Sequence, residues 1–129
     1  MLFKTFGLVK TVGLVSALLL ASAFPAYAQS ACAEPIAPAP IDGGSATTGQ
    51  MNAMHDDVVT FLKQSDDYQL CLLKEMNDAK DAAKKDKKDF DPAVEAAVRT
   101  KIQANQTLKE KVGGEFNTSV TAYKAKHPG

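Results

Sequence analysis

Mostly apolar side chains recur at spacings of three or four residues along two long stretches of the chain, and Glu75 is the one charged interruption of the first. The first stripe runs through Met51, Met54, Val58, Phe61, Ser65, Tyr68, Leu72, Ala79 and Ala82. The second stripe runs through Val94, Val98, Ile102, Asn105, Leu108, Val112, Phe116, Val120 and Tyr123. This period is typical of amphipathic helices. It predicts an all-α fold with one helix from about 47 to 85 and a second that runs to the stop at 127–129.

The segment between the two stripes predicts a tight hairpin tip. Consecutive charged residues at 84–89 end the first period. Asp91 followed by Pro92 then signals a new helix, since an Asp side chain caps free amides and Pro fits the first helical position. We therefore expect a long antiparallel helical hairpin of coiled-coil type, whose domain spans 48–127.

The register of this hairpin and a pair of glycines give two further expectations. A turn near residue 88 would place Leu72 opposite Asn105 and Ser65 opposite Val112. Gly113 and Gly114 should each weaken the second helix by about 1 kcal/mol relative to Ala. The pair predicts either a kink or the close approach of a bulky neighbour to the backbone.

The first 28 residues have the pattern of a secretory signal peptide. Lys4 and Lys10 lie before or beside an apolar run at 12–24, and small residues at Ala26 and Ala28 suit cleavage before Gln29. A retained membrane anchor is the alternative, but the run is short for a membrane span. We expect the mature chain to be periplasmic or secreted, with no stable membrane span after cleavage.

Residues 29–47 predict an extended N-terminal arm. They are rich in Pro, Ala, Gly, Ser and Thr and show neither a helical nor a strand period. Cys32, Pro35, Pro38 and Ile41 recur at every third residue. In a polyproline II helix, which has three residues per turn, all four would share one edge.

The two cysteines, Cys32 and Cys71, are predicted to form a disulfide, because an exported chain meets an oxidising environment. The bridge requires the arm to fold back antiparallel along the first helix. Ile36 and Ile41 would then cover the groove between the helices. The alternatives are a lipid on Cys32, although an aliphatic residue three positions earlier is lacking, and a pair of free thiols.

Charge and composition narrow the classes of partner. Acidic and basic residues balance, at 15 each, so the clustered positive charge of a nucleic-acid-binding protein is not expected. The chain has no Trp and is short, so its core should be thin and should need a staple or a partner. If the arm leaves Leu70, Leu73 and Leu108 uncovered, these leucines should pair two copies into a homodimer.

Candidate chemistry is sparse. Met51, Met54 and His55 are the one group with ligand character, since thioethers and imidazole suit copper outside the cytoplasm. The competing interpretation is that the two methionines are the apolar end of a helix stripe. No nucleophile and base can be paired, so we expect neither an enzyme nor a cofactor.

Three short motifs carry a family resemblance. Cys32 to Pro38, Tyr68 to Cys71 and the Asn-containing stretch from Asn105 to Asn117 resemble those of small exported two-cysteine helical proteins of proteobacteria, which have no assigned function. The resemblance implies an exported helical hairpin with one disulfide, and it supplies no activity.

The expected function is therefore that of a non-enzymatic exported helical protein. It would serve as a protein-interaction or structural module of the cell envelope and bind an unknown protein partner along its helical face. The alternative is a periplasmic copper-type module that uses Met51, Met54 and His55.

Overall fold

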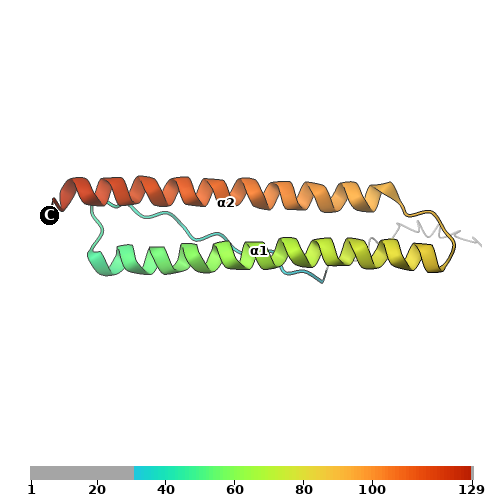
Figure 1. Ribbon diagram of the computed structural model, residues 1–129. Helices are drawn as coiled ribbons and strands as arrows, with labels where there is room; N and C mark the ends of the chain where they lie inside the picture. The colour runs from blue at the N-terminus through green and yellow to red at the C-terminus, as the bar shows by residue number, and fades with distance from the viewer. Residues whose placement is uncertain (1–30, 129) are drawn as a thin grey trace, which may run out of the picture.

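The computed structural model describes residues 31–128, and the expected signal peptide lies outside them. Two helices, α1 (Thr48–Lys85) and α2 (Pro92–Lys126), lie side by side along their lengths (Figure 1). Thr48 contacts Tyr123 at one end of the pair, and Lys80 contacts Glu95 near the other. The predicted all-α fold and the helical hairpin are confirmed for the described residues.

Local capping sets the ends of α1. The Thr47 side chain accepts a hydrogen bond from the Gln50 amide, and the Gln50 side chain accepts one from the Thr47 amide. This capping box satisfies two amides that the first turn leaves free. At the other end Lys87 has a left-handed backbone, with φ of 51°. The amide of Lys88 reaches back to the Ala83 carbonyl, as in a Schellman motif.

The start of α2 follows the Asp-Pro signal. The Asp91 side chain accepts a hydrogen bond from the Ala93 amide at 2.8 Å, and Pro92 is the first helical residue. Because these contacts form between near neighbours in the chain, the position of the helix start could be predicted from the sequence.

The core consists of two apolar clusters separated by a polar layer. The first cluster contains Met54, Val58, Phe61 and Val112. The second contains Tyr68, Leu72 and Val98. Between them, the buried Asn105 side chain donates to Ser65 Oγ at 3.3 Å and accepts from Gln69 Nε2 at 2.8 Å. Every buried side-chain nitrogen and oxygen among the described residues has a partner.

This polar layer corrects the predicted register. Asn105 bonds Ser65 and Gln69, whereas the sequence placed it opposite Leu72 and placed Ser65 opposite Val112. The predicted pairing was displaced by about one helical turn, because a hairpin tip of uncertain length leaves the register open. The buried amide selects the observed register, since it is satisfied only opposite other polar groups.

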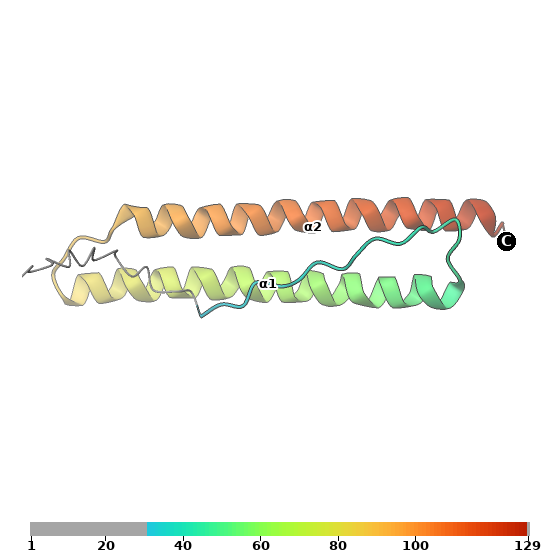
Figure 2. The same ribbon diagram turned by 180° about the vertical axis from the view of Figure 1, so that it is seen from behind.

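Residues 31–46, the N-terminal segment, run beside the helices without regular secondary structure (Figure 2). Ala37 and Ile41 pack against the first cluster and Cys32 against the second. Ile36 does not cover the groove as expected, because its side chain is 90% exposed. Three-residue periodicity explains the error: Ile36 does not share the edge that carries Cys32 and Ile41.

Neither expectation for the glycine pair holds. α2 runs unbroken and straight through Gly113 and Gly114 (Figure 1), and a Cβ at either position would meet nothing within 4 Å. The close approach occurs instead at Gly43, where a Cβ would lie 1.8 Å from the Ser119 carbonyl oxygen. The hydroxyl of Ser119 donates to the Ile41 carbonyl at 2.6 Å nearby.

Candidate functional site

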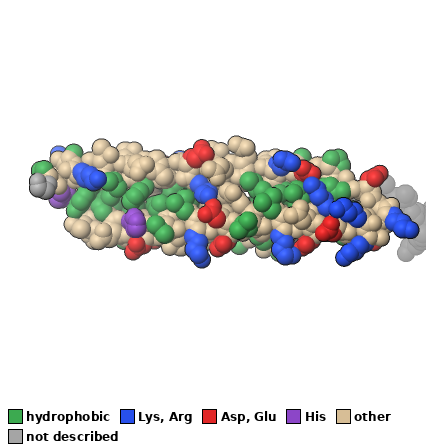
Figure 3. Space-filling model, in the orientation of Figure 1, with side chains coloured by type: hydrophobic (Ala, Val, Ile, Leu, Met, Phe, Trp, Pro, Cys, Tyr) green, Lys and Arg blue, Asp and Glu red, His purple; other side chains and the backbone are tan. Residues whose placement is uncertain are grey.

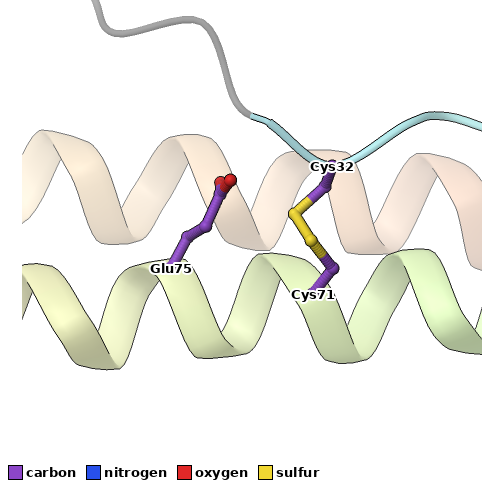
Figure 4. Close-up of side chains that lie close together, drawn as sticks. All are labelled: Cys32, Cys71 and Glu75. Atoms are coloured by element: carbon purple, nitrogen blue, oxygen red, sulfur yellow. A yellow bond between two sulfur atoms is a disulfide. The ribbon is translucent and has the colours of Figure 1, made fainter.

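The predicted disulfide is present between Cys32 and Cys71, whose Cα atoms are 5.7 Å apart. The Glu75 carboxylate lies one helical turn beyond Cys71 and accepts a hydrogen bond from the Ala31 amide at 2.8 Å. Figure 4 shows the bridge joining the N-terminal segment to α1, with Glu75 next along the helix. One carboxylate oxygen and both sulfurs lie within 4.8 Å of one another. Because the sulfurs are bonded to each other, they are not thiolate ligands for a metal.

A shallow hollow of about 510 Å³ opens beside the disulfide, and α1 and the N-terminal segment line it together. Its wall includes Tyr68, Asp67 and Glu34. Burial, and to a lesser degree the nearby charges of Glu34 and Glu75, raise the pKa of the Tyr68 phenol. The hollow therefore offers a neutral phenol beside carboxylates, which suits hydrogen bonding better than nucleophilic chemistry.

The residues of the predicted copper site differ in how deeply they are buried. Met51 and Met54 are buried, and Met54 belongs to the first core cluster. The His55 side chain is 59% exposed, with Nδ1 3.2 Å from Asp56 and its ring 5.9 Å from that of Phe116. Thus the methionines pack as core residues and the imidazole faces solvent. Copper binding stays a prediction, which titration of the protein against a His55→Ala variant tests.

The most distinctive feature of the surface is an apolar face that the N-terminal segment leaves open. Of the described residues, Ile36, Val59, Leu70 and Leu73 are the large apolar side chains with the greatest exposure. The last three share one side of α1 at helical spacing. The stripe through Gln64, Tyr68, Cys71 and Glu75 instead meets the N-terminal segment, on another side of the helix.

The figures show the same two-sidedness. The N-terminal segment crosses in front of α1 in Figure 2, so the opposite view in Figure 3 shows the face that it leaves uncovered. There, hydrophobic side chains gather along the seam between the helices, and charged side chains interrupt them. We call this surface the open face. By helical spacing from the exposed apolar residues and from the ion pairs between the helices, it comprises Val59, Asp66, Leu70, Leu73 and Lys80 of α1 and Glu95, Ile102, Lys109 and Phe116 of α2.

Two ion pairs bridge the helices at the open face. Asp66 pairs with Lys109, and Lys80 pairs with Glu95 at 2.8 Å. Arg99 adds a second contact to Glu95 at 2.6 Å. The hydrogen bonds from Lys80 and then Arg99 lower the pKa of Glu95 to about 2. Pairs of opposite charge therefore link the two helices between the apolar residues of this surface.

Sequence reasoning found part of this face. It identified Leu70 and Leu73 but grouped them with Leu108, which is half-buried and packs against the first cluster. It missed Val59, and it placed Glu95 near the lysines at 84–88 rather than beside Lys80. It also missed the pairing of Asp66 with Lys109. The sequence signal for this face was a seven-residue spacing, which joins Val59, Asp66, Leu73 and Lys80. The residues of α2 that lie opposite them follow only from the correct register.

Comparison with family models, with curated proteins and with solved structures finds no match to this chain. The resemblance to small exported proteins of proteobacteria therefore stays a prediction. Within residues 31–128, neither helix has an apolar stretch of the length that crossing a bilayer requires. The structure defines a disulfide-bonded helical hairpin with one uncovered apolar face, and the function must be inferred from that face.

Proposed function

We propose that this protein is a non-enzymatic, exported helical module of the cell envelope that binds another protein through its open face. One observation carries the proposal: Val59, Leu70 and Leu73 are 51%, 64% and 40% exposed on the same side of α1. Clustered exposed apolar side chains with charged neighbours are typical of protein-binding surfaces. A rigid helical face of this kind suits a helical partner.

The Pro-rich arm explains why binding would be confined to one side. It packs Ala37 and Ile41 on the first cluster and is joined to α1 through Cys32. The opposite face has no such cover from the described residues. In this proposal the disulfide-pinned arm closes one groove of the hairpin and so leaves a single surface for a partner.

Two observations support an exported location. The disulfide between Cys32 and Cys71 is compatible with an oxidising compartment. The sequence before residue 29 has the pattern of a cleaved secretory signal. The periplasm or the extracellular medium is therefore the proposed location.

Site-specific photo-crosslinking in cells tests the proposed function. A photoreactive amino acid at Leu70 should give a discrete protein adduct in envelope fractions. The matched control carries the same amino acid at Asp78, whose side chain is 64% exposed and pairs within α1 with Lys74. Adducts of equal yield from both positions, or none from Leu70, would contradict the proposal.

A further inference from the structure

The open face has an ordered pattern of four levels along the hairpin. On α1, residues at a spacing of seven are Val59, Asp66, Leu73 and Lys80. On α2, residues at the same spacing, read in the opposite direction, are Phe116, Lys109, Ile102 and Glu95. The ion pairs Asp66 to Lys109 and Lys80 to Glu95 fix two of the levels. Because the helices are antiparallel, the same seven-residue steps put Leu73 level with Ile102 and Val59 level with Phe116, whose ring also lies 5.9 Å from that of His55.

The levels therefore alternate between an apolar pair and a pair of opposite charges. In a hairpin that works alone, the positions flanking the core seam are commonly charged throughout. Here Val59 is 51% and Leu73 is 40% exposed, while Ile102 and Phe116 are only partly buried. An apolar stripe that extends beyond the seam indicates packing against further helices.

We infer that the open face binds a second copy of this chain, in an antiparallel four-helix bundle with a two-fold axis parallel to the helices. The inference rests on the proposed function and names its partner. Such an axis places α1 of one copy over α2 of the other at an unchanged level. Every pair that is level within one chain is then also level between the two chains.

Charge complementarity favours this arrangement. Asp66 of each copy would face Lys109 of the other, and Lys80 would face Glu95, so the charges alternate in sign around each charged level. The alternative is a two-fold axis perpendicular to the helices, running across both of them at the level of Asp66. It would place Asp66 of one copy on Asp66 of the other, and Lys109 on Lys109. Juxtaposed like charges are strongly unfavourable at an interface, so they oppose that alternative.

The apolar levels supply the contact area between the charged levels. Val59 of one copy would cover Phe116 of the other, and Leu73 would cover Ile102. These contacts would bury Val59 and Leu73, two of the three large apolar side chains that α1 exposes most. The N-terminal segments remain outside the bundle because each lies on the opposite side of its own hairpin (Figure 2).

A charge-reversal series measured by sedimentation equilibrium tests the inference on the oxidised protein purified from the periplasm. The unmodified chain should dimerise. Asp66→Lys should weaken association by about 100-fold or more, because each copy then presents two lysines at this level. Lys109→Asp should act in the same way, and the double variant Asp66→Lys with Lys109→Asp should restore the dimer.

Mixing the two single variants provides a sharper result. A chain with Asp66→Lys and a chain with Lys109→Asp complement each other, so they should form a heterodimer. Asp67→Lys is the matched control, since it makes the same charge change on the side of α1 that faces the N-terminal segment. It should leave association unchanged. Circular dichroism on each variant verifies that the helices form.

Three results would overturn the inference. The first is a strict monomer at every concentration up to near-millimolar. The second is an Asp66→Lys variant that dimerises as tightly as the unmodified chain. The third is a failure of the two single variants to pair when they are mixed. If the chain is monomeric while Leu70 crosslinks to a different envelope protein, self-association is wrong and the proposed function stands. If the chain is monomeric and Leu70 also crosslinks to no protein, both are wrong.

Discussion

At the scale of single residues, two close contacts join the N-terminal segment to α2 at Ser119. Gly43 lies so close to α2 that a Cβ would be 1.8 Å from the Ser119 carbonyl oxygen and 3.0 Å from its Cα. The Ser119 hydroxyl donates to the Ile41 carbonyl at 2.6 Å. Position 43 therefore requires glycine because any side chain would collide with α2. Its backbone angle is not the reason, since no described glycine has a positive φ.

We predict opposite effects from two glycine substitutions. Gly43→Ala should destabilise the protein by about 1–3 kcal/mol, because either the backbone or α2 must shift. Gly114→Ala should stabilise it by about 0.5–1 kcal/mol, since a helical position with open space gains from the better helix former. Urea unfolding measures both. Equal effects of the two changes would show that Gly43 does not make a close contact.

The buried amide of Asn105 gives a second prediction at this scale. Asn105→Ala should lower the free energy of unfolding by about 1–3 kcal/mol, because it removes two hydrogen bonds and leaves the buried Ser65 hydroxyl without its donor. The matched control is Asn117→Ala, an exposed position on the same helix, which should change stability by less than about 0.5 kcal/mol. Similar losses in both variants would argue against the polar layer.

At the scale of the helices, the pairing of α1 with α2 depends on apolar clusters and on ion pairs at their edges. Glu95 is the most connected of the edge residues, since it bonds Lys80 on α1 and Arg99 on its own helix. Its pKa is lowered to about 2 from an ordinary value of 4.5. A carboxyl whose pKa is lowered by folding stabilises the fold at pH values above its ordinary pKa and loses that effect as pH falls.

We therefore predict that part of the acid sensitivity of this protein comes from Glu95. Its contribution should be complete above about pH 4.5 and should disappear as pH falls toward about 2. Glu95→Gln should be less stable than the unmodified chain at neutral pH, and the two stability curves should converge across that window. Unfolding measured from pH 7 to 2 checks this.

Glu110→Gln is the control for this measurement. Glu110 lies on the same helix and accepts a hydrogen bond from Gln106 within α2. A variant at this position should keep the acid sensitivity that Glu95→Gln removes. If the difference between Glu95→Gln and the unmodified chain were the same at every pH, the pKa of Glu95 would not be the cause.

At the scale of the whole molecule, the disulfide connects the N-terminal segment to a two-helix core that is thin by itself. The bridge closes a loop with a sequence separation of 39. In the chain-entropy model, a loop of this length stabilises the folded state by about 4 kcal/mol. Few other contacts hold the segment: the hydrogen bond from the Ala31 amide to Glu75, Ala37 and Ile41 on the core, and the contacts around Gly43 and Ser119.

We predict that Cys71→Ser lowers the free energy of unfolding by about 2–4 kcal/mol. It should also make residues 31–46 sensitive to proteolysis, because the segment loses its covalent link to α1. Cys32→Ser must behave in the same way, since both changes remove one bond. Unchanged melting and unchanged cleavage would show that the segment docks through its non-covalent contacts alone.

The sequence by itself determined the two helices, their ends and the disulfide. The capping box at Thr47 and the restart at Asp91 depend on residues two or three positions away, so their chemistry can be read directly from the chain. The pairing of Cys32 with Cys71 was predictable because a chain with two cysteines has one intramolecular partner for each.

Only the tertiary structure decided the register, the location of the tight glycine and the identity of the open face. Asn105 meets Ser65 and Gln69 rather than Leu72 because a buried amide needs polar partners, and the helical period alone does not specify them. Gly43, unlike the glycine pair on α2, contacts a helix that is remote in sequence. The ion pairs of the open face likewise join residues whose proximity depends on how the two helices align in space.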